Sequence, residues 1–200
     1  MKRITLQLFC LLWTVISIAQ NSLSSEDQEK AIKHLKATQK ELLAVVDGLN
    51  DEQINYKPND DSWSVAECME HIAISEKNLI EMIKMSLQEE ADPDKRSEVA
   101  MTDDQILGLI TSREQKVKTR EEFEPTNSFG GFDETIETFQ KRRKANIKFV
   151  KSADKNLRNY YLQFPFGLID SYQGILFMSG HTERHIDQIR EILASEGFPG

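Results

Sequence analysis

The last long helix of the chain is specified by the stretch Gly180-His181-Thr182-Glu183-Arg184-His185-Ile186-Asp187-Gln188-Ile189. With His181 set at zero and about 100° per residue, His185 falls at about 40° and Ile189 at about 80° on a helical wheel. Both imidazoles therefore lie within the apolar arc, which in a globular protein faces the core. The stretch predicts an amphipathic helix that carries two histidines toward the interior of the protein.

Helical spacing of apolar side chains continues through most of the remaining chain. Ser64 and Glu67 form the sequence pattern of a capping box at the start of one helix, and Asp170 or Ser171 caps the last one. Asp133 is expected to cap a further helix. The predicted helices span about residues 25–49, 64–89, 102–119, 133–152 and 171–195.

Four main helices and one short one, with no clear alternation typical of strands, predict an all-α protein with a four-helix bundle. The short helix falls in the long passage between the second and third main helices. This passage has room for a crossover, so the helices need not follow simple up-down-up-down order. Two further segments are predicted as loops: residues 50–61, and the aromatic stretch 160–167, where Pro165 excludes a helix interior.

The first 19 residues have the pattern of a secretory signal peptide. Lys2 and Arg3 precede an apolar run over residues 4–18, and Ala19 closes a small-residue cleavage site. A retained membrane anchor is the alternative, but the run is too short to span a bilayer comfortably. We therefore predict cleavage after Ala19, a mature domain over residues 20–200, a secreted or periplasmic location, and no stable membrane anchor after cleavage.

The mature chain is acidic and contains a single cysteine. Loss of Lys2 and Arg3 leaves 23 of the 25 basic residues against 33 acidic ones, a formal charge of −10. This charge argues against nucleic acid and anionic membranes as partners. Only Cys68 remains once Cys10 is removed, so no intrachain disulfide is expected.

His71 is the third histidine of a possible metal site. On the helix that follows Ser64, it lies on a polar stripe with Glu67, Ser75 and Asn78. Two imidazoles on one helical face and a third from another helix can form a facial three-nitrogen site with an open position. The alternative for His71 alone is a structural or solvent-exposed histidine. The spacing of the downstream pair, His181 and His185, favours the metal site.

Other polar residues near these histidines give weaker signals. Thr182 occupies the position that a catalytic glutamate holds in the zinc-protease His-Glu-x-x-His motif, so that motif is absent. Glu67 is a candidate base or fourth ligand, but the capping box is the favoured interpretation. Cys68 could bind zinc, although a buried apolar role is more common. Gln188 could orient a ligand, and His34 is predicted at the surface. The catalytic residues are therefore left unassigned.

These residues resemble those of a known family. A helix that opens with Trp63-Ser64-Val65-Ala66-Glu67 and reaches Glu70-His71-Ile72, together with the paired-histidine helix, is similar to the DinB-like superfamily. The resemblance covers nearly the whole mature chain and implies a bundle in up-down-down-up order. It also implies a divalent ion, zinc or nickel, held by His71, His181 and His185. Homodimers are common in such families, and a small-molecule substrate is expected.

The resemblance leaves the reaction open, because one fold can support many activities. Members of the superfamily include bacillithiol and mycothiol S-transferases, a thiol-dependent maleylpyruvate isomerase and proteins described as metal-dependent hydrolases. Those thiols are cytosolic, whereas this chain carries an export signal, so a hydrolase that uses metal-activated water is favoured. A thiol S-transferase-like enzyme, a non-catalytic metal-binding or interaction bundle, and a bundle with relic histidines are the alternatives.

Overall fold

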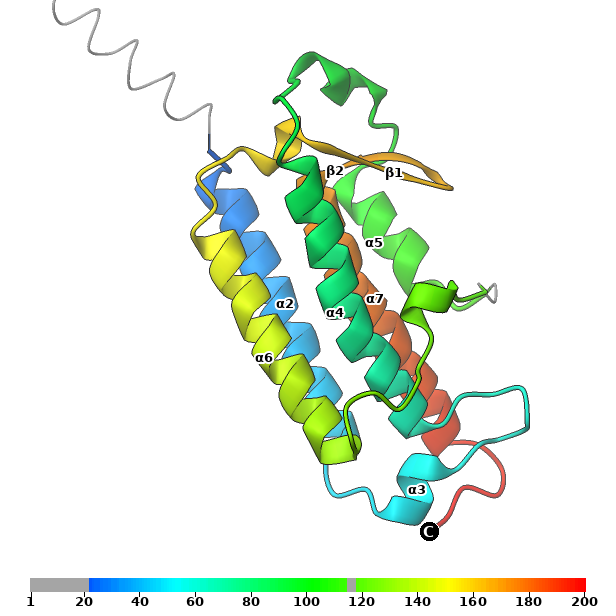
Figure 1. The fold of residues 1–200 in the computed structure, drawn as a ribbon. Coiled ribbons are helices and arrows are strands. Elements are labelled where there is room, and N and C mark those ends of the chain that lie inside the picture. Colours follow the sequence, from blue (N-terminus) through cyan, green and yellow to red (C-terminus); the bar gives the residue numbers. More distant parts are fainter. Residues whose placement is uncertain (1–21, 115–117) are drawn as a thin grey trace, which may run out of the picture.

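The computed structural model describes residues 22–114 and 118–200. Four long helices form a bundle (Figure 1): α2 (Ser25–Val46), α4 (Val65–Ser86), α6 (Phe132–Lys151) and α7 (Ser171–Leu193). The helices α2 and α7 run in one direction and α4 and α6 in the other, which confirms the predicted up-down-down-up order. The short helix α5 (Asp103–Thr111) lies in the crossover between α4 and α6, as predicted, but it ends at Thr111 rather than near residue 119. It packs against α7.

Side-chain caps mark the beginning of three of the main helices, α2, α4 and α7. Ser64 and Glu67 form the predicted capping box at the start of α4, and Asp170 forms another with Gln173 at the start of α7. The prediction that Asp133 caps α6 is wrong, because the N-cap is Gly131 and Asp133 lies inside the first turn. An acidic side chain is also favourable there, next to the positive end of the helix dipole.

Two short elements were not predicted. The expected loop over residues 50–61 contains α3 (Asp51–Asn55), which is only five residues long and is capped by Asn50. The aromatic stretch forms an antiparallel hairpin of β1 (Tyr161–Phe164) and β2 (Gly167–Asp170). Three short 3₁₀ helices complete the secondary structure of the described residues: η1 (Asp94–Glu98), η2 (Glu121–Phe123) and η3 (Leu157–Asn159).

A buried ion pair lies at the centre of the bundle. Arg143 of α6 and Glu76 of α4 are 0% and 1% exposed, and Arg143 Nε donates to Glu76 Oε2 at 3.0 Å. The same guanidinium donates to the carbonyl oxygen of Leu35 and the hydroxyl of Thr38 on α2, and to the hydroxyl of Thr182 on α7. One side chain therefore contacts all of the other long helices and fixes their relative heights.

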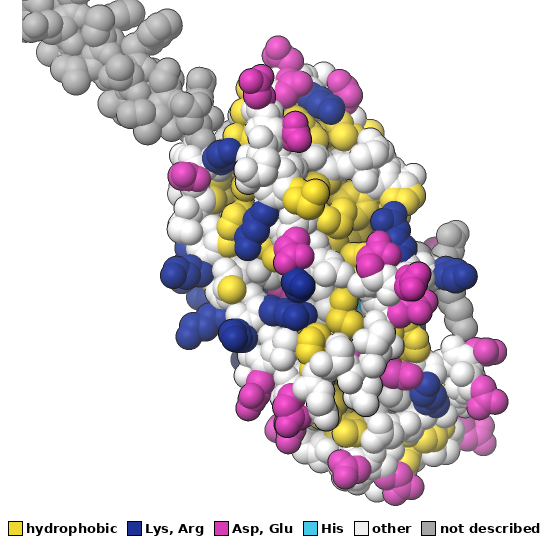
Figure 2. Space-filling model, in the orientation of Figure 1, with side chains coloured by type: hydrophobic (Ala, Val, Ile, Leu, Met, Phe, Trp, Pro, Cys, Tyr) yellow, Lys and Arg dark blue, Asp and Glu magenta, His cyan; other side chains and the backbone are white. Residues whose placement is uncertain are grey.

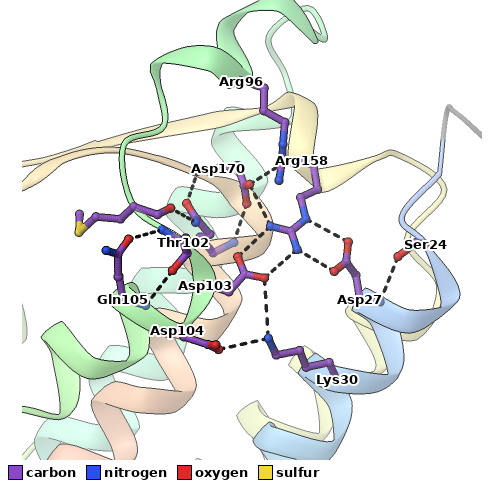
Figure 3. A network of polar contacts seen from close by, with 12 residues as sticks. Ser24, Asp27, Lys30, Arg96, Thr102, Asp103, Asp104, Gln105, Arg158 and Asp170 are labelled. Atoms are coloured by element: carbon purple, nitrogen blue, oxygen red, sulfur yellow. Dashed lines mark hydrogen bonds and ion pairs between the residues drawn. The ribbon is translucent and has the colours of Figure 1, made fainter.

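A second arginine joins helix N-termini at one end of the bundle (Figure 3). Arg158 donates to Asp27 in the first turn of α2, to Asp103 in the first turn of α5, and to Asp170, the N-cap of α7. Its guanidinium also lies 4.0 Å from the centre of the Tyr172 ring. These contacts hold the crossover helix α5 against the bundle, next to the start of α7.

Within the described part of the chain, no helix is long and apolar enough to cross a membrane. The predicted signal peptide, residues 1–19, lies outside the described residues and stays a prediction. Cys68 is a free, buried cysteine of α4.

Candidate metal centre

The structure brings His71 of α4 together with His181 and His185 of α7. The distance between the Nε2 atoms of His71 and His181 is 3.1 Å, and that between the Nε2 atoms of His181 and His185 is 3.2 Å. One ligand atom from each of the three histidines lies within 4.8 Å of the others. The three histidines of α4 and α7 therefore lie together, as expected. Their role as metal ligands stays a prediction.

Carbonyl oxygens on the far side of two rings determine which nitrogen carries the proton. His71 Nδ1 lies 2.7 Å from the carbonyl oxygen of Phe123, which can only accept a hydrogen bond. His185 Nδ1 lies 2.8 Å from Gln188 Oε1, and Arg113 Nη1 approaches the same oxygen at 3.4 Å. Because arginine only donates, the Gln188 atom that faces it is the carbonyl oxygen. Both Nδ1 atoms are therefore protonated and both Nε2 atoms carry lone pairs.

The Nε2 atoms of His71 and His185 both lie close to Nε2 of His181. His181 Nε2 can carry at most one proton, so at most one of its two close contacts, to His71 and to His185, is a hydrogen bond. A divalent cation accepts all three lone pairs at once. An ion that binds nitrogens at about 2.0–2.1 Å, with angles of about 100°, holds them about 3.1–3.2 Å apart. The two observed separations, from His181 to His71 and from His181 to His185, therefore fit a metal ion.

Burial keeps the three imidazoles uncharged. It lowers the pKa of His71, and it lowers the pKa of His181 and His185 well below the usual 6.5. The neighbouring histidines lower the pKa of His181 and His185 further, because a second positive charge at the centre would be repelled. Neutral imidazole is the form that binds a metal, so the site has this form at pH 7.

Aromatic rings and a polar cavity surround the histidines. The Trp63 ring lies 4.8 Å from the His71 ring and 6.1 Å from the His185 ring, measured between centroids. A cavity of about 590 Å³ opens at this side and is lined by Trp63, His185 and Gln188 together with Arg113 and Arg184. One histidine of the centre, His185, therefore borders a partly charged pocket of a size that suits a small molecule.

Other candidate residues are engaged elsewhere. Glu67 is held by the capping box of α4 and by Lys57, whose Nζ lies 2.6 Å from Glu67 Oε1, so it is not available as a base. Cys68 is buried in the apolar core, and burial raises the pKa of its thiol. His34 is half-buried rather than at the surface, and its Nδ1 lies 2.7 Å from Ser179 Oγ. Among the described residues, the metal-ligand geometry joins the three histidines alone.

The last helix follows the predicted geometry closely. Glu183 and Asp187 of the same helix are partly exposed, and Asp187 pairs with Arg190. Gln188 contacts His185 as anticipated. Sequence reasoning missed the Phe123 carbonyl and Arg113, which come from the crossover. No sequence pattern identifies a backbone carbonyl that accepts a hydrogen bond from a histidine far away in the sequence.

Comparisons with known proteins agree with this arrangement. The model of the DinB superfamily matches residues 34–189. The uncharacterized protein YuaE of Bacillus subtilis (strain 168) is 25% identical over 149 residues, which cover 72% of this chain and 86% of YuaE. A solved structure of YfiT from Bacillus subtilis is described as a probable metal-dependent hydrolase with an unusual four-helix bundle topology. It superposes with a TM-score of 0.63 at 18% identity over 89% of this chain and 92% of YfiT.

Proposed function

The chain belongs to the DinB superfamily, and from this membership and the histidine geometry we propose that it is a metal-dependent hydrolase of a small molecule. The converging Nε2 atoms of His71, His181 and His185 are the observation on which the proposal depends. Because Nδ1 carries the proton in His71 and His185, the Nε2 atoms of these two rings have lone pairs that can bind a cation. The description of YfiT as a probable metal-dependent hydrolase supports the same class of reaction.

The residues of the site have distinct roles in this proposal. His71, His181 and His185 hold the ion, while Gln188 and the Phe123 carbonyl orient two of the rings. Trp63 covers the His71 and His185 rings and limits the access of bulk water. A divalent ion with three neutral ligands keeps its full charge, which lowers the pKa of a bound water to about 7 and polarises a substrate oxygen. Hydrolysis by such a site does not depend on a nearby carboxylate.

Zinc and nickel are the ions that we propose. Imidazole nitrogen suits both ions, and three such ligands leave a position open for water or substrate. The metal content of protein purified without an affinity tag tests this directly. We expect about one equivalent of metal in the wild-type protein, less than about a tenth of that in His185→Ala, and an unchanged content in the control His34→Ala. A metal-free wild-type protein, or full metal binding by His185→Ala, would overturn the proposal.

Turnover then separates the proposed hydrolase from other metal-binding proteins. We expect the metal-loaded protein, but not His185→Ala, to hydrolyse members of a panel of esters and amides. Turnover of thiol adducts alone would instead indicate a thiol S-transferase-like enzyme. Stoichiometric metal with no turnover of any of these compounds would indicate a non-catalytic metal-binding bundle.

The compartment in which the protein acts is part of the proposal. We propose that the mature protein begins at Gln20 and is secreted or periplasmic, because residues 1–19 have the pattern of a signal peptide. Mass spectrometry of the N-terminus of protein recovered outside the cytoplasm tests this. An intact Met1 on exported protein would contradict cleavage.

A further inference from the structure

A row of aromatic rings leads away from the histidine centre toward the hairpin. The Phe177 ring of α7 lies 6.4 Å from the His181 ring, with an angle of 19° between the two planes. The Phe164 ring of β1 lies 5.0 Å from the Phe177 ring. Phe166, in the turn between the strands, lies 5.0 Å from Phe164 and 5.7 Å from Phe177. The rings of Phe177, Phe164 and Phe166 therefore form a continuous apolar surface, which we call the aromatic row.

The aromatic row reaches the solvent. Phe166 is 36% exposed, whereas Phe164 and Phe177 are half-buried. On the face drawn in Figure 2, hydrophobic side chains gather in a patch below the hairpin. Large exposed apolar groups that adjoin a polar site often mark a place where a ligand binds.

Attachment of the hairpin to the bundle depends on other contacts. Leu162 and Ile169 pair across the two strands, and both are buried in the core. The amide of Ser171 donates to the carbonyl oxygen of Tyr160 at 2.8 Å, and Arg158 contacts Asp170. Phe164 and Phe166 lie beyond these contacts, near the turn. The hairpin is therefore held to the bundle by contacts other than those of Phe164 and Phe166 with Phe177.

The aromatic row and the polar cavity lie on different sides of the histidines along α7. Phe177 lies one turn before His181, whereas the cavity is lined by His185 and Gln188. Two guanidinium groups, those of Arg113 and Arg184, line that cavity. The side toward Phe177 presents ring faces instead. A substrate held at the centre would therefore meet an apolar wall in one direction and a charged pocket in the other.

We propose that the aromatic row binds a phenyl-sized apolar group of the substrate while the reacting group lies at the histidine centre. The inference rests on the proposed function, since it assigns the substrate class of the same site. Aromatic rings favour offset-stacked or edge-to-face contact with another ring at centroid separations of about 4.5–7 Å. The protein should therefore prefer aryl-substituted acyl compounds to acetyl compounds of the same kind.

Hydroxamates with different tails test this preference, because the hydroxamate group binds the ion and the tail reports on its surroundings. The probes are acetohydroxamate and 3-phenylpropanohydroxamate, titrated by calorimetry into the zinc-loaded protein. We expect the phenyl compound to bind at least tenfold more tightly than acetohydroxamate. This ratio should fall at least threefold in Phe166→Ala and in Phe177→Leu. The second variant keeps an apolar side chain at the half-buried position.

A matched control variant and the affinity of each variant for acetohydroxamate separate the possible outcomes. Phe198→Ala removes a ring that contacts Tyr56 near the C-terminus, at the other end of the bundle, and should leave the ratio unchanged. Binding of acetohydroxamate should be the same in all variants. Equal affinities for the two probes in the wild-type protein, or an unchanged ratio in both ring variants, would overturn the inference and leave the metal site intact. Failure of both probes to bind would instead count against the proposed function.

Discussion

At the scale of single residues, two carbonyl oxygens determine which nitrogen carries the proton in His71 and His185. The Phe123 carbonyl and Gln188 Oε1 each accept from an Nδ1–H group, which leaves Nε2 of His71 and His185 free to bind a cation. Loss of a partner that orients a ligand and increases its basicity typically weakens metal affinity by about 10–100-fold. Gln188 is the side chain on which this effect can be measured.

Replacement of Gln188 by alanine should weaken metal binding without abolishing it. His185 then loses the acceptor that fixes its orientation and protonation state, so we expect the dissociation constant for zinc to rise by about tenfold. Gln188→Glu keeps an acceptor and should retain or strengthen binding. Competition with a chromogenic chelator measures both constants. Gln163→Ala, at an exposed position of the hairpin, is the control. Unchanged affinity in Gln188→Ala would show that the contact does not support the ligand.

The lowered histidine pKa values predict how the stability of the metal-free protein depends on pH. In the unfolded chain these imidazoles take up protons near pH 6.5, whereas burial keeps His71, His181 and His185 neutral to a lower pH in the folded state. The unfolded state therefore binds more protons as the pH falls, and stability declines. Each histidine contributes up to about 1.4 kcal/mol per pH unit between its two pKa values.

Urea denaturation in the presence of a chelator at pH 7, 6 and 5 measures this decline. We expect the free energy of unfolding to fall steadily over the interval, and to fall less steeply in His181→Leu. His34, whose pKa is also lowered by burial, should account for part of the remaining slope. A flat profile between pH 7 and pH 5 would contradict the assignment of buried, neutral histidines.

The sequence was most informative where a side chain depends on its own helix. The helical wheel placed His181, His185 and Gln188 correctly, because their relative positions are fixed by the pitch of one element. Arg113 and the Phe123 carbonyl reach the site through a crossover whose path depends on tertiary packing. Their contribution could therefore not be predicted from local spacing.

At the scale of elements, the four long helices were predictable because each combines a long apolar stripe with start and stop signals. The helix α3 and the hairpin were missed for a different reason. Five residues of helix and two four-residue strands are too short for their periodicity to stand out. Both lie against the bundle: α3, with its buried Ile54, contacts α4, and the hairpin, with its buried Leu162 and Ile169, contacts α7. Such elements depend on tertiary contacts more than on local preference.

The buried pair of Arg143 and Glu76 should be the most sensitive polar contact between these elements. Arg143→Met leaves the Glu76 carboxylate buried without its cation, which we expect to destabilise the fold by about 3–5 kcal/mol. The double variant Arg143→Met with Glu76→Leu should recover much of this loss, because both charges are removed together. Urea denaturation of the two single variants and the double variant measures the coupling. Additive losses would show that the pair does not act as a unit.

At the scale of the whole molecule, the histidine centre depends on the crossover as well as on the bundle. His71 and His181 are 110 residues apart in sequence, and the segment between them contains both α5 and η2. Glu70, next to His71, accepts from the backbone amides of Asn127 and Ser128 and so holds the return of the crossover against α4. The site is therefore assembled only when α4, α7 and the crossover pack together.

Metal binding should for this reason stabilise the entire fold. The unfolded chain does not hold three nitrogens within 4.8 Å of one another as the folded chain does. The ion therefore binds the native state preferentially and shifts the unfolding equilibrium. At a free zinc concentration of 100 times the dissociation constant, the expected gain is about 2.7 kcal/mol. Thermal unfolding followed by circular dichroism should show a higher Tm with zinc, and a chelator should reverse the shift. His185→Ala should show no such shift, whereas His34→Ala should behave like the wild type. An equal zinc-dependent rise in His185→Ala would mean that the ion binds elsewhere, because two nitrogens at this centre cannot match the affinity of three.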